Sequence, residues 1–344
     1  VLSQTITVPT VGSNPGFTAI QNYAYDNLNR LASADEKPQG WTDANCTTEP
    51  TKCWKQTFVY DRYGNRTFDT TASRTTTIPT NCPPALYNPT ANTNNRLKTT
   101  DGYTFDNAGN TTKDAELRKF TYDAENKQTK VETTDANGTV IATNGEYWYD
   151  GDGKRIKKKA YTNNVLTEET IFVYDASGKL VAEYSTNIEP VATAKVAYLT
   201  NDHLGSPRIN TDRDGNITAR HDYHPFGEEI ATSQRTAGLG YSNVTVRKQF
   251  TGYERDVESK LDFAEARMYN FLHGRFTSPD DFRNDTDGND PQSWNLYLYV
   301  RNKPLLLVDP TGKMGDFYEV GTGRYLGSDG IKDYKVYAAV VSKE

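Results

Sequence analysis

The sequence of 344 residues has little of what marks a membrane-spanning, metal-binding or nucleic-acid-binding protein. No stretch approaches the ~20 consecutive apolar residues of a transmembrane helix, so we expect no membrane span in this segment. The three cysteines, Cys46, Cys53 and Cys82, form no CxxC or Cys/His cluster, which predicts no metal site and no cofactor. The net charge of −6, without a basic stripe, argues against a nucleic acid partner.

The chain opens with Val1 and with no signal-peptide pattern. We therefore expect a fragment of a longer protein, and this start does not bear on the export of the parent. Cys46 and Cys53 bracket a short polar loop and could close a small disulfide, which would require an oxidising compartment.

Methionine is nearly absent at 2 residues and hydrophobic residues make up 35%, whereas tyrosine is abundant at 23 residues. Many narrow strands, each burying one face, give a lower apolar share than one thick core. Tyr and Thr favour half-buried pleated surfaces, and Asn, Asp and Gly favour the turns between them. The composition therefore predicts an all-β protein.

The densest basic run, residues 154–159, is interpreted as a solvated strand face whose lysines discourage edge pairing.

An aromatic residue followed by aspartate recurs through the first half of the chain and is followed by a polar turn. We interpret each pair as the end of a strand, where Asp folds its carboxylate onto backbone N–H groups of the turn. A Gly or Asn two or three residues later accepts positive φ, and a second strand leaves in the opposite direction. We predict that these aspartates are structural and neither catalytic nor metal-binding. They are Asp26, Asp61, Asp106, Asp123, Asp150 and Asp175.

Six such pairs within 150 residues resemble the YD repeats of the Rhs, Tc-toxin C-component and teneurin class. The resemblance implies that residues 1–196 form an antiparallel β-ribbon that winds into part of a hollow shell. Residues 69–95, rich in Thr, Pro and Asn, are interpreted as a loop excursion from this ribbon.

A denser set of motifs begins at about residue 197. The runs YLTNDHLGSPRINTDRDGNITARHDYHPFGEEI, QFTGYERDVESKLDFAEARMYNFLHGRFTSPDD and PQSWNLYLYVRNKPLLLVDPTGK resemble the RHS repeat-associated core. The resemblance implies that residues 197–312 spiral inward and close one end of the shell as a plug. Inside this core we expect a helix over residues 261–270 and strands over residues 295–299 and 305–308.

Several histidines lie near other polar residues in this second half. His203 lies between Asp202 and Ser206, but a triad is recognised by geometry and no GxSxG elbow accompanies it, so we assign no catalysis to these residues. We expect His221 and His224 to hydrogen-bond locally rather than to hold a metal.

The resemblance also implies a self-cleavage of the aspartic type just after a DPxGL motif. Such chemistry needs two carboxylates close enough to share a proton. Asp280 and Asp309 match the two aspartates, while Asp281 stands where the family often has Pro and Lys313 where Leu is expected. The alternative interpretation is that Asp309 only caps a turn closing the core.

These features favour a shell and plug segment of a polymorphic-toxin-type protein that encapsulates its own C-terminal cargo polypeptide for delivery to other cells. Residues 313–344, with a strand-like run at 335–341, would begin the variable C-terminal region. We expect a bacterial protein, secreted or at the cell surface and exported by a secretion system.

One alternative is an extracellular adhesion or structural scaffold that contacts carbohydrate or other proteins. Another is a self-processing aspartic peptidase. A substantial divergent domain after Gly312 in the parent gene would favour the toxin over the scaffold.

Overall fold

A computed structural model describes residues 1–10, 12, 15–73, 88–187, 196–230, 235, 246–282 and 291–313, and the backbone of three strands beyond Lys313. Almost every described element is a β-strand, so the all-β prediction is confirmed. The helical elements are the six-residue helix α1 (Asp43–Thr48) and 3-10 turns of three or four residues. No helix among the described residues is long and apolar enough to cross a membrane.

The first sheet has five strands in chain order, each antiparallel to the next. A disulfide between Cys46 and Cys53, of the kind expected, closes the loop between its third and fourth strands. Cys82 and most of the predicted loop excursion lie outside the described residues. The strands are β1 (Ser3–Val8), β2 (Phe17–Tyr25), β3 (Leu31–Pro38), β4 (Trp54–Tyr60) and β5 (Arg66–Phe68).

The second sheet continues the ribbon as an eight-stranded antiparallel meander, again in chain order. A three-stranded antiparallel sheet follows it. The strands are β6 (Thr104–Phe105), β7 (Thr111–Lys113), β8 (Arg118–Tyr122), β9 (Gln128–Thr134), β10 (Val140–Tyr149), β11 (Arg155–Thr162), β12 (Val165–Tyr174), β13 (Leu180–Ser185), β14 (Tyr198–Asn201), β15 (Pro207–Thr211) and β16 (Ile217–Arg220).

One turn geometry explains why the chain reverses so regularly. Asp150 accepts the backbone N–H groups of Asp152 and Lys154 at 3.0 and 2.9 Å, while Gly153 adopts a φ of 75°. Asn126, with a φ of 61°, takes the glycine place in the turn of Asp123. The other aspartates of the six pairs accept turn N–H groups in the same way. Four aspartates without a preceding aromatic residue do so too: Asp114, Asp135, Asp202 and Asp212.

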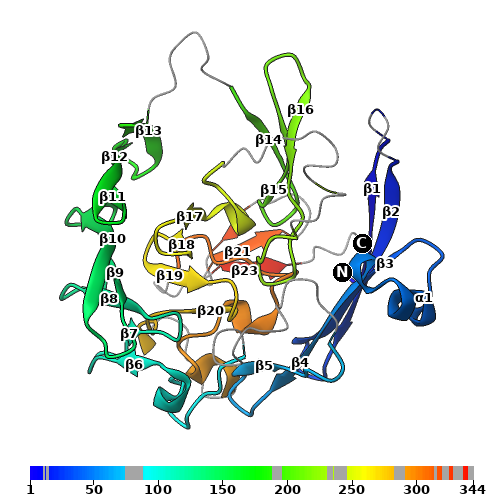
Figure 1. Cartoon of the computed structure of the whole chain (residues 1–344), viewed down its shortest axis with the longest axis horizontal. Coiled ribbons are helices and arrows are strands. Elements are labelled where there is room, and N and C mark those ends of the chain that lie inside the picture. The colour runs from blue at the N-terminus through cyan, green and yellow to red at the C-terminus, as the bar shows by residue number, and fades with distance from the viewer. Residues whose placement is uncertain are drawn as a thin grey trace.

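The three sheets form a curved outer wall, and a four-stranded antiparallel sheet lies inside it (Figure 1). This inner sheet consists of β17 (Glu254–Asp256), β18 (Leu261–Ala264), β19 (Arg267–Asn270) and β20 (Arg275–Phe276). Phe120 and Tyr147 of the wall pack against Leu261 and Met268 of the inner sheet. The ribbon winding around an inward-placed core is therefore confirmed.

The predicted helix over residues 261–270 is wrong. The segment is the β18–β19 hairpin, and Glu265 at its turn has a φ of 55°, which a right-handed helix does not contain. Asp262 is fully buried in this hairpin because its carboxylate pairs with Arg255 of β17 at 2.7 Å. A buried aspartate with an arginine opposite it on β17 stabilises the pairing of β17 with β18, which a helix over residues 261–270 would not allow.

The two strands predicted near the end of the core are also wrong. Residues 295–299 form a turn with a single bridge, from Leu298 to Arg275. Residues 305–308 form turns in which the N–H groups of Leu306 and Leu307 both point to the carbonyl of Lys303. Leu305 packs against one hydrophobic cluster and Leu307 against another, so the run is apolar because it joins two clusters.

Beyond Lys313 the backbone forms β21 (Asp316–Glu319), β22 (Tyr325–Gly327) and β23 (Val336–Ala339). Strand β21 pairs antiparallel with β22 and parallel with β23. The predicted strand at residues 335–341 corresponds to β23.

Candidate functional site

The structure brings Asp280 and Asp309 together around one guanidinium group. The Arg267 Nη2 atom lies 2.9 Å from Asp280 Oδ2 and 3.4 Å from Asp309 Oδ2. Arg267 begins β19, and Asp280 follows β20 with its backbone N–H bonded to the carbonyl of Leu296 at 2.9 Å. Two aspartates that are 29 positions apart in the sequence therefore share one donor nitrogen.

Asp309 is fully buried and also serves as a turn cap. Its Oδ1 accepts the backbone N–H of Lys313 at 3.0 Å, and its carbonyl accepts the hydroxyl of Tyr253. One oxygen of Asp309, Oδ1, therefore caps the turn, and the other, Oδ2, lies beside the guanidinium group that also contacts Asp280.

The segment around Gly312 is clamped by the β18–β19 turn. The backbone N–H of Ala266 donates to Thr311 O at 3.0 Å, and Arg267 Nε donates to Gly312 O. Gly312 has a φ of 68°, and a Cβ there would lie 2.4 Å from Ala264 O. Only glycine fits this close approach, so the backbone leading to Lys313 is held in one position.

A cleft of about 400 Å³ opens beside these residues. Asp280, Asp281 and Lys313 line it from the core, and the turns 125–127 and 151–153 line it from the wall. Lys127 Nζ donates to the carbonyl of Glu265 at 3.2 Å across this boundary. Burial, followed by the charge of Lys313, lowers the pKa of Lys127.

The arrangement differs from a symmetric dyad that shares one proton. One guanidinium nitrogen of Arg267 contacts a carboxylate oxygen of both Asp280 and Asp309, so a cation lies where a dyad would hold a shared proton. The Asp280 side chain is 9% exposed and lines the cleft, whereas that of Asp309 is 0% exposed. Asp280 is therefore the carboxylate that meets the cleft, and Asp309 accepts the N–H of Lys313.

The Asp202, His203 and Ser206 side chains do not form a triad. Asp202 caps its own turn, Ser206 Oγ accepts the N–H of Thr251 at 2.9 Å, and His203 Nε2 lies 3.3 Å from Leu305 O.

His221 and His224 have different surroundings. His221 bonds locally, as predicted, to Glu229 at 2.7 Å and to Asn210 at 3.2 Å. His224 packs edge-on against Trp54, and burial lowers its pKa to about 3. Among the residues that the structure describes, no group of three or more His, Cys, Asp or Glu could hold a metal.

The interpretation of residues 154–159 as a solvated face is wrong for two of its members. Arg155 and Lys158 are 1% and 2% exposed and point into the core. A register shift makes Tyr149 pair with Arg155 and Trp148 with Lys157, so Ile156 is the extra residue of a bulge. The bulge puts positions 155 and 158 on one face, which plain strand alternation would not do.

We call Arg155, Lys158, Glu254, Asp256 and Glu258 the charged cluster. Arg155 lies 2.6 Å from Asp256 Oδ2 and 2.9 Å from Glu254 Oε2, and Lys158 Nζ lies 3.1 Å from Asp256 Oδ1. Burial alone would raise the pKa of Glu254, but the charges of Arg155 and Lys158 lower it to about 2. The cluster joins β11 of the wall to β17 of the core.

A second buried link joins the first sheet to the segment that follows β16. Arg235 lies 2.6 Å from Glu36 of β3 and 2.8 Å from Asp222. Burial alone would raise the pKa of Asp222, but Arg208, Arg220 and Arg235 lower it to about 2. Buried ion pairs thus join the first sheet to the segment after β16, and β11 to the inner sheet.

Comparison with known proteins agrees with this architecture. The chain is 30% identical over 271 residues to the tRNA3(Ser)-specific nuclease WapA of Bacillus spizizenii, covering 74% of this chain and 11% of that protein. It is 24% identical over 351 residues to the toxin subunit YenC1 of Yersinia entomophaga, covering 86% of this chain and 34% of that protein. The chain thus spans about a third or less of the length of these relatives.

Among solved structures, the TcdB2-TccC3-Cdc42 crystal structure matches 90% of this chain and 15% of its own chain, with a TM-score of 0.52 at 17% identity. No family model matches the chain. The chain is similar in sequence to toxins of the Rhs and Tc type, and its fold matches that of a Tc toxin assembly.

Proposed function

We propose that this chain is the last part of an Rhs-type toxin shell, which encloses a C-terminal cargo polypeptide until delivery to another cell. Residues 1–196 would form wall, and residues 197–312 would form the plug, although the first strands of that range, β14–β16, lie along the wall. Residues from 313 onward would be the start of the cargo region. The protein would be secreted or surface-exposed and exported by a bacterial secretion system. Its partners would be its own cargo or other proteins.

The observation that carries this proposal is the fixed exit of the chain from the core. The wall curves around the inner sheet (Figure 1), and the buried ion pairs of the charged cluster join β11 of the wall to β17 of the inner sheet. Within the core, Arg267 and Asp309 hold the backbone at Gly312 and Lys313. A shell that stores a polypeptide needs a wall of hydrogen-bonded strands and a fixed starting point for what it stores, and the antiparallel sheets and the held segment at Gly312 and Lys313 support both.

Protease protection tests the storage role. In the full-length polypeptide of the same gene, we expect the region after Lys313 to resist trypsin under native conditions and to be cut rapidly once urea unfolds the shell. Mass spectrometry of the fragments identifies the cut sites. Equal cutting of this region in the native and unfolded states would exclude encapsulation and would favour an adhesive scaffold.

We also propose self-cleavage near Lys313, because Asp280 and Asp309 meet at Arg267 beside this residue. In this proposal Asp280 takes a proton from a water in the cleft, and the water oxygen adds to the carbonyl carbon of a peptide bond next to Lys313. The C–N bond then breaks, and the proton passes from Asp280 to the departing amine, while Asp309 fixes the amide of Lys313.

Intact mass of the full-length polypeptide tests the cleavage. We expect a fragment ending near Lys313 that disappears in the Asp280→Asn variant, which removes the base, and in the Asp309→Ala variant, which removes the acceptor of the Lys313 N–H. The Asp175→Asn variant, which keeps an acceptor oxygen in a turn that does not line the cleft, should be cut like the unsubstituted protein. An uncut chain in every case would remove the cleavage proposal and leave an uncleaved shell.

A further inference from the structure

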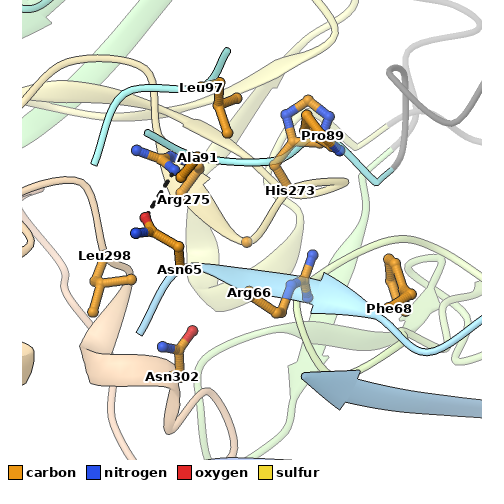
Figure 2. A pocket seen from close by; sticks show the side chains of 11 residues that line it. Asn65, Arg66, Phe68, Pro89, Ala91, Leu97, His273, Arg275, Leu298 and Asn302 are labelled. Atoms are coloured by element: carbon orange, nitrogen blue, oxygen red, sulfur yellow. Dashed lines mark hydrogen bonds between the residues drawn. The ribbon is translucent and has the colours of Figure 1, made fainter. Parts of the chain in front are cut away.

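A small, partly open cavity lies where the wall meets the core. Its volume is about 10 Å³, which is room for roughly one water-sized or halide-sized particle. Asn65 and Arg66 line it from the wall, and Arg275 and Asn302 line it from the core. Figure 2 shows these side chains together, with the hydrogen bond between Arg275 and Asn65.

Two guanidinium groups face this cavity, and neither forms an ion pair with a carboxylate among the described residues. Arg66 lies over the backbone of Gly274, where a Cβ would come within 3.0 Å of the guanidinium carbon. Arg275 follows directly in the sequence. The charges of Glu228 and Asp61 act on Arg66 and Arg275, but less strongly than burial does, so the cavity gathers two cations that burial disfavours.

The neighbours of Arg66 are aromatic rings and a carbonyl. Its guanidinium carbon lies 4.0 Å from the ring centroid of Phe226 and 5.0 Å from that of Phe68, and Nη2 donates to Leu272 O at 2.7 Å. Burial lowers the pKa of Arg66. Ring faces and carbonyls attract a cation, but they leave its net charge in place.

Arg275 is in a similar position. Its Nη2 donates to Asn95 O at 2.6 Å, Nη1 donates to Asn65 Oδ1 at 3.4 Å, and the guanidinium lies 4.7 Å from the ring centroid of Tyr297. Burial lowers the pKa of Arg275 to about 10. A charge removed from water without a counter-charge is costly.

The other buried arginines in the described part of the chain are paired with carboxylates, which offset the cost of burying the charge. Each has a carboxylate within 3.0 Å, as in the pairs Arg118–Asp114, Arg155–Asp256, Arg235–Glu36 and Arg267–Asp280. Arg275 is the exception among the arginines that are buried in the described part of the chain, and it shares its cavity with a second cation.

We infer that this cavity binds a small monovalent anion, chloride under natural conditions, between the Arg66 and Arg275 guanidinium groups. Charge-assisted hydrogen bonds from two guanidiniums in a low-dielectric site favour an anion over a neutral water. A space of about 10 Å³ favours a single-atom anion over phosphate, sulfate and carboxylate ligands. Because one arginine belongs to the wall and the other to the core, the bound anion fastens the two together.

Thermal unfolding at constant ionic strength tests the site, with chloride replaced by methanesulfonate, which is too large for the cavity. A ligand that binds only the folded state stabilises it by RT ln(1 + [L]/Kd), so the melting temperature should rise by roughly 2–4 °C per tenfold increase in chloride above Kd. Arg275→Gln should remove this dependence. Arg62→Gln, at an exposed arginine of the neighbouring turn, should retain it. A melting temperature that does not respond to chloride would overturn the inference.

Bromide gives a second test, which uses the unsubstituted chain and so does not depend on whether a variant folds. Crystals of the unsubstituted chain grown in bromide should show an anomalous peak between Arg66 and Arg275. Density without anomalous signal at that place would identify a water and would refute the anion site.

Discussion

Replacing Arg155 by Met should loosen the core from the wall. The Arg155 side chain is 1% exposed, and it lies 2.6 Å from Asp256 and 2.9 Å from Glu254, whose side chains are 0% and 4% exposed. Met has a similar length and leaves little space unfilled, so the main effect is the loss of charge. The two carboxylates would then keep Lys158 and, at 3.9 Å from Glu254, Arg247 as their cationic neighbours, and breaking a buried pair in this way costs about 3–5 kcal/mol.

Hydrogen exchange of peptides that cover β11 and β17 measures the free energy of local opening at the two strands that the charged cluster joins. A loss of about 3–5 kcal/mol in the free energy of opening corresponds to exchange that is roughly a hundredfold to a few thousandfold faster. Lys157→Met is the matched control on the same strand. Lys157 is 30% exposed and pairs with Glu169 at 2.8 Å on the outer face, so its removal should change the opening energy by about 0.5 kcal/mol or less.

The double variant with Asp256→Asn separates charge from packing. Removing the carboxylate together with the arginine leaves less unpaired charge, so the double variant should be less destabilised than the sum of the two single variants. If Arg155→Met exchanges no faster than Lys157→Met, or if the two single effects simply add, the charged cluster does not hold the core. The apolar packing of Phe120 and Leu261 would then be sufficient.

Two further predictions concern the pH response and the turns. Burial, and then the charge of Asp256, raise the pKa of Glu258 to about 7, although Lys158 opposes the shift. The folded chain therefore binds this proton more tightly than the unfolded chain, so stability is greatest below the unfolded pKa and falls as the pH rises through about 7. Glu258→Gln should flatten this dependence and raise the melting temperature at pH 8, and an unchanged profile would contradict the assignment. Asp150→Ala, which removes two acceptor bonds of 3.0 and 2.9 Å to turn N–H groups, should cost about 1 kcal/mol and lower the melting temperature by a few degrees; no change would make the cap dispensable.

The wall could be predicted from the sequence because its turns are local. An aspartate, the N–H groups two to four residues later and a residue with positive φ lie within one short segment. An aromatic residue before the aspartate is not required for the turn, since Asp114 and Asp135 cap the same kind of turn after Lys and Thr. The aspartate and the residue with positive φ predict the turn. The aromatic residue that precedes some of these aspartates indicates side-chain packing instead.

The core could not be predicted in the same detail because its contacts are distant in sequence. Residues 305–308 are apolar without being a strand, since they join two hydrophobic clusters. Family resemblance indicated Asp280 and Asp309, but Arg267, which touches both, was absent from that prediction. The burial of Arg155 depends on a bulge and on a partner about a hundred residues away.

The position of the charges suggests how the core finds its place on a repetitive wall. The hairpins of the wall resemble one another, and Tyr and Phe side chains pack with little directional preference, so apolar contacts alone would permit docking at a neighbouring hairpin. Strand β11 presents Arg155 and Lys158 together on its inner face because of its bulge, and β17 presents Glu254 and Asp256 to them. Docking one hairpin away would leave these charges buried without partners, at a cost of several kcal/mol. We infer that the charged cluster selects the register of the core, in which case the Asp256→Asn variant should slow native docking as well as destabilise the docked state; equal docking rates would limit its role to stability.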